Sequence, residues 1–356
     1  MNKISMVENA CRELLQYGVF DRRKKIENFI RQRLFHQLVA AEDMIFWPTG
    51  LLAAGLWAGR ASLLADGPAA RGIEEALGAY YERWIKRGMP IAAIDDLLAG
   101  ETLLAVYTEI KAGFGGFEKV MSEQQVRAAA DKLAGYAMEH PKDGPGSFFY
   151  RPATGEPYIF VDSIGQACPF LYQYGETVDR QGYRELALCQ IVNFLSYGMD
   201  GASGLPYHGY DMTDGCKYGI IGWGRAVGWL LRGMLGCMTS DYGRERLEES
   251  CTALMDAVLP YQRQDGYFCW QLQAMEGPAD TSATGMICAA LKKGRSLGIF
   301  AGEKYENALR AGRRALEKSA VDGLVSQCSG ECEGFSRYPQ RYGAYPWSLG
   351  PALEVL

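Results

Sequence analysis

The chain has 356 residues and a mass of 39.3 kDa, which allows one large domain or two of ordinary size. Hydrophobic residues make up 48% and charged residues 22%, a balance that excludes disorder over most of the chain. The net charge of -5 and an isoelectric point of about 5.5 argue against nucleic acid as the main partner. They do not exclude a small acidic sugar, because such a ligand responds to the local field of its pocket.

The N-terminal residues predict no secretion signal, because acidic side chains interrupt the apolar run that a signal peptide needs. No uncharged stretch reaches the length of a membrane span. The ten cysteines are scattered through helical sequence, which predicts reduced thiols in a cytoplasmic protein. Cys328 and Cys332 are the closest pair, but no second Cys or His pair lies nearby, so we expect no metal and no cofactor.

Apolar residues recur with helical spacing in the first 140 residues and predict six helices. Residues 1–41 hold two helices, with Gly18 between them. Their apolar positions are Ile4, Val7, Cys11, Leu14 and Leu15 in the first and Ile26, Phe29, Ile30, Leu34 and Leu38 in the second. The third helix begins at Trp47, with a proline tolerated in its first turn. The others include residues 76–84, 95–107 and 122–139.

Residues 141–161 interrupt this pattern with four prolines and three glycines, which predict a long structured loop or a short hairpin. Helical spacing then resumes at 162–178, 182–197, 220–238, 243–262, 280–298 and 302–319, and 345–356 reads as a short final helix. Between these helices recur Asp-Gly loops with aromatic neighbours. The longer loops are therefore the places where functional side chains are expected.

In total the pattern predicts about twelve helices, joined alternately by tight turns and by longer loops. We therefore predict an all-α fold with a single domain over 1–356, in which the long loops gather at one end of a helical array. No alternating run is long enough for a sheet core. A helical solenoid is the competing arrangement, although the sequence shows no repeat of fixed period.

One carboxylate stands out, because residues 158–171 place Asp162 where apolar sequence passes into a helix. Aspartate is a preferred N-cap residue, so a purely structural role is open. Apolar neighbours such as Phe160 and Phe170 predict poor hydration, which raises the pKa of a carboxyl group. A raised pKa suits a general acid at neutral pH, so Asp162 is also a candidate catalyst.

Two glycine- and aromatic-rich segments add further candidates. Residues 204–214 contain His208, one of only three histidines, and a helix start shortly afterwards carries Trp223, Arg225 and Trp229 beside glycines. Helix N–H groups and a guanidinium together suit a carboxylate, and aromatic rings beside them suit a sugar. The alternative is structural: Arg225 ties two helices together and Trp229 fills space in the core.

Five short motifs occur in a recognisable order. They are Val161-Asp-Ser-Ile-Gly-Gln-Ala-Cys-Pro-Phe-Leu171, Tyr207-His-Gly-Tyr-Asp211, Trp223-Gly-Arg-Ala-Val-Gly-Trp229, Gln264-Asp-Gly-Tyr-Phe-Cys-Trp-Gln271 and Asp280-Thr-Ser-Ala-Thr-Gly-Met286. Together they resemble the unsaturated glucuronyl and rhamnogalacturonyl hydrolases, glycoside hydrolase families 88 and 105. The match looks strongest to the rhamnogalacturonyl branch and covers roughly residues 90 to 356.

The resemblance implies an (α/α)6 barrel that hydrolyses the Δ4,5-unsaturated uronic acid, here galacturonic, which polysaccharide lyases leave at a non-reducing end. In the family's reaction one carboxylic acid protonates C4 of the vinyl ether and then helps water attack C5. Matched by position, Asp162 is this acid/base and Asp95 is the family's second aspartate. Asp95 is also compatible with a plain N-cap, and its neighbour Asp96 leaves the register open.

The same resemblance implies substrate contacts for a group of pocket residues, namely Tyr207, His208, Trp223, Arg225 and Trp229. His208 is equally compatible with a buried core residue. The chain departs from the family at Ala226-Val227, where Gly-Asn is common, and this puts the substrate in doubt more than the reaction. Asp280 is expected to cap a helix, and Cys328 to Gly330 are expected to shape the substrate entrance.

The predicted partner is a short oligosaccharide, with no nucleic acid and no membrane, and the oligomeric state stays open. Two other functions are carried forward. One is another (α/α)6 carbohydrate enzyme, such as an inverting glycosidase, which needs a second essential carboxylate opposite the first. The other is a non-catalytic sugar-binding protein.

Overall fold

The computed structural model describes residues 3–19, 22–36, 42–63 and 67–356. Within these ranges the chain forms thirteen α-helices, four short 3-10 turns and seven strands of two residues each. The prediction of an all-α protein with about twelve helices is confirmed. In this part of the chain no helix is both long and apolar enough to cross a lipid bilayer.

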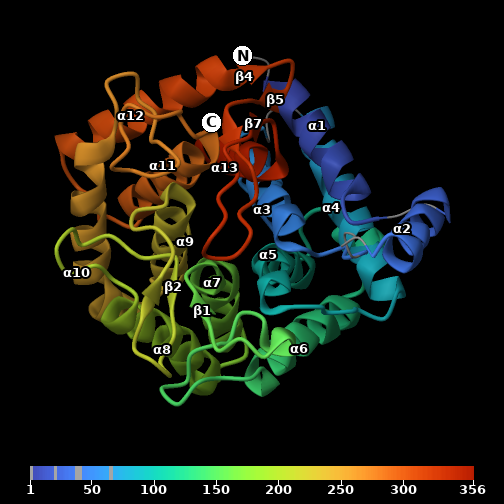
Figure 1. Ribbon diagram of the computed structural model, residues 1–356. Helices are drawn as coiled ribbons and strands as arrows, with labels where there is room; N and C mark the ends of the chain where they lie inside the picture. Colours follow the sequence, from blue (N-terminus) through green and yellow to red (C-terminus); the bar gives the residue numbers. More distant parts are fainter. Residues whose placement is uncertain (1–2, 20–21, 37–41, 64–66) are drawn as a thin grey trace.

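Twelve helices form two concentric rings (Figure 1). The inner ring consists of α3 (Trp47–Ser62), α5 (Leu98–Ala112), α7 (Asp162–Thr177), α9 (Gly224–Gly236), α11 (Thr281–Ser296) and α13 (Pro346–Val355). The outer ring consists of α1 (Lys3–Gln16), α4 (Gly67–Lys86), α6 (Glu123–Glu139), α8 (Gln181–Tyr197), α10 (Asp241–Val258) and α12 (Glu303–Ser319). This alternation of inner and outer helices is the predicted (α/α)6 barrel.

The two ends of the chain meet where the barrel closes. Helix α13 packs against α3, and α1 contacts both of them. Two glycines permit this close approach: a Cβ on Gly55 would lie 2.3 Å from the Gly350 carbonyl oxygen, and one on Gly350 would lie 2.4 Å from the Leu51 carbonyl oxygen. A larger residue at either position would therefore force the first and last inner helices apart.

Helix α2 (Arg22–Leu34) belongs to neither ring and lies outside them (Figure 1). Its helical state is as predicted, but its apolar residues do not face the core. Phe29 is 62% exposed and Leu34 71% exposed, while Leu38 lies outside the described residues. Helical spacing shows which side chains share a face, but not whether a neighbouring helix covers that face.

Local signals place most helix ends correctly. Asp280 caps α11 as predicted: its Oδ1 accepts hydrogen bonds from the Ser282 backbone N–H at 2.9 Å and from the Ser282 hydroxyl at 2.6 Å. The predicted fifth helix is divided, because a 3-10 turn over Ile94–Leu97 precedes α5. Residues 141–158 form the expected structured loop, with one isolated bridge between Lys142 and Phe148.

Short strands fasten the long loops to one another. Strands β1 (Ile159–Phe160), β2 (Gly209–Tyr210) and β3 (Lys217–Tyr218) form one antiparallel sheet, in which Ile159 pairs with Tyr210 and Phe160 with Gly209. Strands β4 (Ala320–Val321) and β5 (Leu324–Val325) form a second pair, and β6 (Cys328–Ser329) and β7 (Tyr342–Gly343) a third. The first sheet joins segments that lie about 50 residues apart, which no local pattern predicts.

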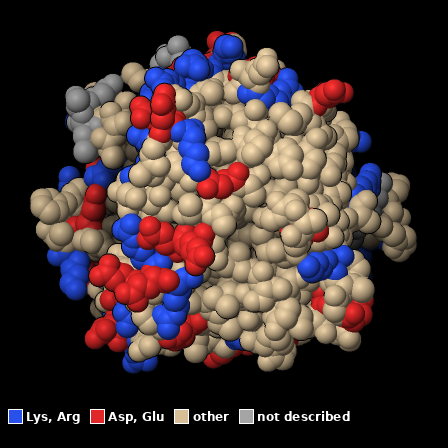
Figure 2. Space-filling model, turned by 90° about the vertical axis from the view of Figure 1, so that its left-hand side faces the viewer, with Lys and Arg blue, Asp and Glu red and all other residues tan. Residues whose placement is uncertain are grey.

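A small central apolar cluster joins side chains of five inner helices with one from β6. It consists of Trp47, Leu51, Leu98, Trp229, Met286, Cys328 and Trp347. On the outer surface, the side of the barrel that carries α10 shows charges of both signs intermingled, beside a broad region without charge (Figure 2).

Candidate active site

The inner helices begin at one end of the barrel, and their N-terminal residues surround a pocket. The pocket is lined by Phe46, Trp47, Asp95, Tyr150, Arg151, Phe160, Asp162, His208, Trp223, Arg225, Trp229, Glu331, Cys332 and Gly334. Six of the seven predicted site residues are among them, and Tyr207 is not. Because helix N-termini carry partial positive charge, this end of the barrel favours an anionic ligand.

Asp162 lies next to His208 because of the short sheet. Asp162 follows β1 by two residues and His208 directly precedes β2, and the Val161 N–H donates to the His208 carbonyl oxygen at 3.0 Å. The His208 Nε2 lies 3.1 Å from Asp162 Oδ2. Asp162 is the first residue of α7, after Val161 at the cap position, and no cap hydrogen bond from a side chain forms there. Its carboxylate is therefore directed to the pocket.

The other ring nitrogen of His208 is held by a residue that the sequence did not suggest. His208 Nδ1 lies 2.8 Å from the Tyr338 hydroxyl, and the ring is wholly buried. Trp223 packs against it with the ring centroids 4.5 Å apart, and Phe335 lies 5.2 Å away. Tyr338 and Phe335 come from the loop between β6 and β7, about 130 residues from His208, so local sequence gave no signal for them.

Asp95, and not Asp96, faces the pocket. The Tyr150 hydroxyl donates to Asp95 Oδ2 at 3.3 Å, and the same hydroxyl lies 3.4 Å from Gln166 Oε1. Asp95 Oδ1 is buried and accepts no hydrogen bond from the described residues. Burial, and secondarily the nearby charge of Asp43, raise the pKa of Asp95 to about 7. Asp95 can therefore be protonated at neutral pH.

Asp96 has the capping role that the sequence offered to either aspartate. Its Oδ2 accepts hydrogen bonds from the backbone N–H groups of Ala92 at 2.7 Å and Ala93 at 3.3 Å. Burial, followed by the charges of Asp43 and Asp95, holds the pKa of Asp96 well above its usual value. The turn that Asp96 caps is the one that points Asp95 into the pocket.

Arg225 lines the floor of the pocket, and its guanidinium is bonded to the protein. Nη1 donates to the Ser329 hydroxyl at 2.6 Å and to Ser282 Oγ at 3.2 Å, and Nη2 donates to the Gly330 carbonyl oxygen at 2.7 Å. Asp280 Oδ2 lies 3.9 Å from Arg225 Nη1, and the Asp280 carboxylate accepts hydrogen bonds from the hydroxyls of the same two serines. Arg225 thus anchors the loop after β6 and also brings positive charge to the pocket.

The remaining predicted residues take different positions. Trp229 is 1% exposed and packs edge-on against Trp47 at 6.0 Å, with the pocket above it. Tyr207 lies outside the pocket, where its ring faces Lys217 at 5.7 Å. Ala226 and Val227 are fully buried in the main core and do not line the pocket.

The loop after β6 lines the pocket, but with residues that follow the predicted Cys328 to Gly330 in the chain. Cys328 is buried in the central apolar cluster, and Ser329 and Gly330 bind Arg225. The residues that line the pocket are Glu331, Cys332 and Gly334. Arg151 also lines the pocket, and its guanidinium carbon is 5.9 Å from the centre of the Tyr150 ring. Neither Glu331 nor Arg151 was predicted, since an isolated charge in a polar loop usually lies in solvent.

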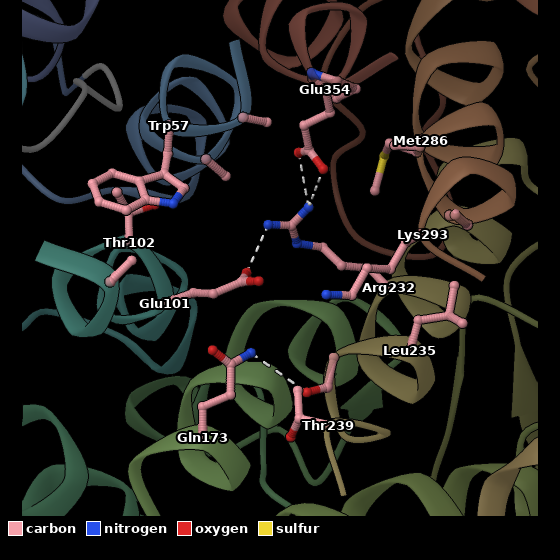
Figure 3. A pocket seen from close by; sticks show the side chains of 18 residues that line it. Trp57, Glu101, Thr102, Gln173, Arg232, Leu235, Thr239, Met286, Lys293 and Glu354 are labelled. Atoms are coloured by element: carbon pink, nitrogen blue, oxygen red, sulfur yellow. Dashed lines mark hydrogen bonds and ion pairs between the residues drawn. The ribbon is translucent and has the colours of Figure 1, made fainter. Parts of the chain in front are cut away.

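A larger cavity, of about 330 Å³, opens at the opposite end of the barrel (Figure 3). Arg232 dominates it and bridges two carboxylates: Nη2 lies 2.7 Å from Glu101 Oε2, and Nη1 lies 2.9 Å from Glu354 Oε1. One guanidinium thus bonds two carboxylates from different inner helices. The pocket at the helix N-termini, with its histidine-linked aspartate and protonatable Asp95, is the better candidate for chemistry.

The described residues contain no group of three or more His, Cys, Asp or Glu side chains that could hold a metal ion. All ten cysteines are free thiols. Burial raises the pKa of Cys332, which lines the pocket, to about 12, so its thiol is a poor nucleophile. The acid–base groups deep in the pocket are the two aspartates and His208, and Glu331 lies nearer its entrance.

Comparison with known proteins gives a consistent result. The chain matches the model of the family described as Glycosyl Hydrolase Family 88 over residues 31–353. Protein Atu3128 of Agrobacterium fabrum and the 24.9 kDa protein in the picA locus of Rhizobium radiobacter are each 34% identical over 161 residues. This alignment spans 42% of the present chain and 69% of each relative.

Solved structures share the fold. A possible member of the GH105 family from Klebsiella pneumoniae superimposes with a TM-score of 0.80 at 16% identity, covering 98% of this chain and 91% of that one. The unsaturated glucuronyl hydrolase of Bacillus sp. GL1 superimposes with a TM-score of 0.66 at 17% identity, covering 98% and 95%. The resemblance inferred from the five motifs is confirmed by the family match and by this shared fold.

Proposed function

The chain belongs to glycosyl hydrolase family 88 and is a glycoside hydrolase, and we propose that it removes a Δ4,5-unsaturated uronic acid from lyase-generated oligosaccharides. The finer proposal is that this residue derives from galacturonate and that the substrate is a short rhamnogalacturonan product. The observation that carries the proposal is the pairing of Asp162 with His208 in a pocket that also holds Asp95.

In the proposed reaction Asp162 acts twice. Its carboxylic acid gives a proton to C4 of the vinyl ether, and the electrons of the C4–C5 double bond form the new C–H bond. Water then adds its oxygen to C5 and returns a proton to the Asp162 carboxylate. The product is a hemiketal at C5, whose ring opens to a ketone, and the resulting hemiacetal at C1 releases the next sugar. The net change is the addition of one water molecule.

His208 and Asp95 have supporting roles in this scheme. Hydrogen bonds to Asp162 and Tyr338 fix the His208 ring, so it can hold the Asp162 carboxylate in one orientation. Asp95, with a pKa of about 7, can present a neutral carboxyl group beside Asp162. A neutral Asp95 avoids a second negative charge near the anionic substrate and can donate a hydrogen bond to a sugar oxygen.

The substrate carboxylate is proposed to lie toward Arg225 and the helix N-termini. Both Nη groups of Arg225 already donate to oxygens of the protein. Arg225 therefore attracts the substrate carboxylate mainly through its positive charge. The aromatic rings of Trp223 and Trp229 flank the same floor. Elimination by a lyase makes C4 and C5 planar, so unsaturated residues from glucuronate and galacturonate are identical. The substrate question therefore concerns the linkage and the next sugar.

The direct test uses an unsaturated galacturonyl–rhamnose disaccharide and follows the loss of vinyl-ether absorbance. In heavy water, the product should carry one deuteron at C4, as judged by NMR. Asp162→Asn should lower kcat by at least about a hundredfold, because a general acid contributes ~10²–10⁴. Asp211→Asn is the matched control, since Asp211 does not line the pocket and its Oδ1 accepts the Thr213 N–H at 2.7 Å.

Retained activity in Asp162→Asn, or a product without deuterium at C4, would refute this mechanism. Cleavage of the saturated galacturonyl–rhamnose disaccharide would favour the inverting glycosidase. Binding without turnover of any unsaturated disaccharide would favour a non-catalytic sugar-binding protein. The cytoplasmic location stays a prediction, and fractionation of the native host's cells with detection of the chain would test it.

A further inference from the structure

The rim of the pocket holds two charged side chains that have no bonded partner. Glu331 and Arg151 are partly open to solvent at the rim and partly enclosed by the pocket, and within the described residues neither side chain has a hydrogen bond or an ion pair. The charged groups deeper in the pocket differ in this respect. Asp162 is bonded to His208, Asp95 to Tyr150, and Arg225 to the loop after β6.

A sugar that enters must displace or contact these two side chains. The cavity volume is only about 50 Å³, so the side chains at the rim must move when a sugar ring enters. The unsaturated ring must reach Asp162 at the floor, so the sugar attached to its C1 remains at the rim. The Arg151 guanidinium contacts the ring of Tyr150, and the Glu331 side chain has no hydrogen bond or ion pair within the described residues. Both side chains can therefore adapt to that sugar without breaking a hydrogen bond or an ion pair.

A carboxylate at the entrance for an anionic substrate needs an explanation. Partial enclosure raises the pKa of Glu331, and so do the charges of Glu333 and Asp162, whereas Arg225 and Arg151 lower it. Glu331 thus lies within the electrostatic reach of Asp162 and of both arginines. A negative charge at this position gives specificity, because it repels a ligand that carries a second negative charge there.

We infer that Glu331 and Arg151 form the subsite for the leaving sugar, and that Glu331 selects against a leaving sugar that carries a negative charge. A neutral sugar can donate a hydroxyl to Glu331 and accept a hydrogen bond from Arg151. A carboxylate or sulfate at the same place would face Glu331 where water is partly excluded. This inference rests on the proposed function and adds the class of leaving sugar to it.

The test compares substrates that differ only in the charge of the leaving sugar. One pair is unsaturated digalacturonate with the leaving sugar's carboxyl free or methyl-esterified. The other is the unsaturated chondroitin disaccharide with or without a 6-sulfate, which covers the other anomeric linkage. The quantity measured is the ratio of kcat/KM for the neutral and the charged member, at pH 7.5 and low salt, for each pair that is turned over.

Wild-type enzyme should prefer the neutral member by about tenfold or more, the scale of one like-charge contact at a partly buried site. Glu331→Gln should bring the ratio to within about twofold of unity, mainly by faster turnover of the charged member. Arg151→Met should change the ratio in the opposite direction, since Glu331 is then unopposed. Glu333→Gln is the matched control on the same loop, because Glu333 is exposed, pairs with Arg337 at 2.8 Å, and does not line the pocket.

The possible failures are distinguishable. No turnover of any unsaturated disaccharide by the wild type would overturn the proposed function and this inference together. Turnover with a wild-type ratio near unity, or with a ratio that Glu331→Gln leaves unchanged, would overturn the inference alone. Equal melting temperatures of Glu331→Gln and Glu333→Gln would show that the comparison is made between folded proteins.

Discussion

Asp95 provides the sharpest test of the electrostatics of the pocket, through the substitution Asp95→Asn. The carboxyl group has a pKa of about 7 in the folded protein, against an ordinary value of 3.8. Well below pH 3.8 both the folded and the unfolded chain hold the proton, so the group does not affect stability. As the pH rises from about 4 to 7, the unfolded chain releases the proton and the folded chain keeps it, so stability falls. Above pH 7 the cost is constant.

The interval from 3.8 to about 7 corresponds to at most ~4 kcal/mol of unfolding free energy. The measured value should be smaller, on the order of 2 kcal/mol, because the charges of Asp43 and Asp96 readjust when Asp95 is neutral. Asn keeps an oxygen that can accept the Tyr150 hydroxyl. We therefore expect Asp95→Asn to be more stable than the wild type at pH 8 and nearly equal to it in stability at pH 4.

The assay is urea denaturation from pH 4 to pH 8, compared with the wild type and with Glu333→Gln, which removes one exposed carboxylate. The control should follow the wild-type curve within about 0.5 kcal/mol at every pH. The reasoning would be refuted if the stability difference between Asp95→Asn and the wild type were independent of pH. A difference that grew toward low pH would have the wrong sign.

Two further changes test other parts of the molecule. Tyr338→Phe removes the hydroxyl that holds His208 Nδ1, and kcat should fall about tenfold with KM nearly unchanged, because a positioning contact is lost; an unchanged kcat would exclude the role. Arg232→Met leaves Glu101 and Glu354 without their shared cation, and the three side chains are only 15–28% exposed. The free energy of unfolding, measured by urea denaturation, should fall by about 3 kcal/mol. The exposed Arg313→Met should change stability by less than about 0.5 kcal/mol, and an equal loss in both variants would contradict a stabilising bridge.

The fold was largely predictable because its signals are local. Apolar spacing at 3.6 residues per turn marks the twelve barrel helices, and Asp280 and the prolines near helix starts mark their ends. The exposed face of α2 shows the limit of this signal. An amphipathic pattern states that a helix has an apolar side, but only the arrangement of neighbours decides whether that side is buried.

The site was predictable in part, and for a different reason. Asp162, His208 and Arg225 lie in short motifs with unusual composition, so they could be singled out from the sequence. Tyr338, Arg151 and Glu331 lie in loops without such a pattern. Their place at the pocket depends on pairings such as β6 with β7, which join residues far apart in the chain.

The sequence alone determined that the chain is helical, and it predicted that one of two adjacent aspartates faces the candidate site. Only the tertiary structure decided which one. Asp96 turns back to bind the N–H groups of Ala92 and Ala93, and this leaves Asp95 directed toward Tyr150 and the pocket. Asp95 and Asp96 are the same residue type and adjacent in the chain, so the sequence does not distinguish them. The direction of each side chain depends on backbone geometry and on neighbours that are distant in sequence.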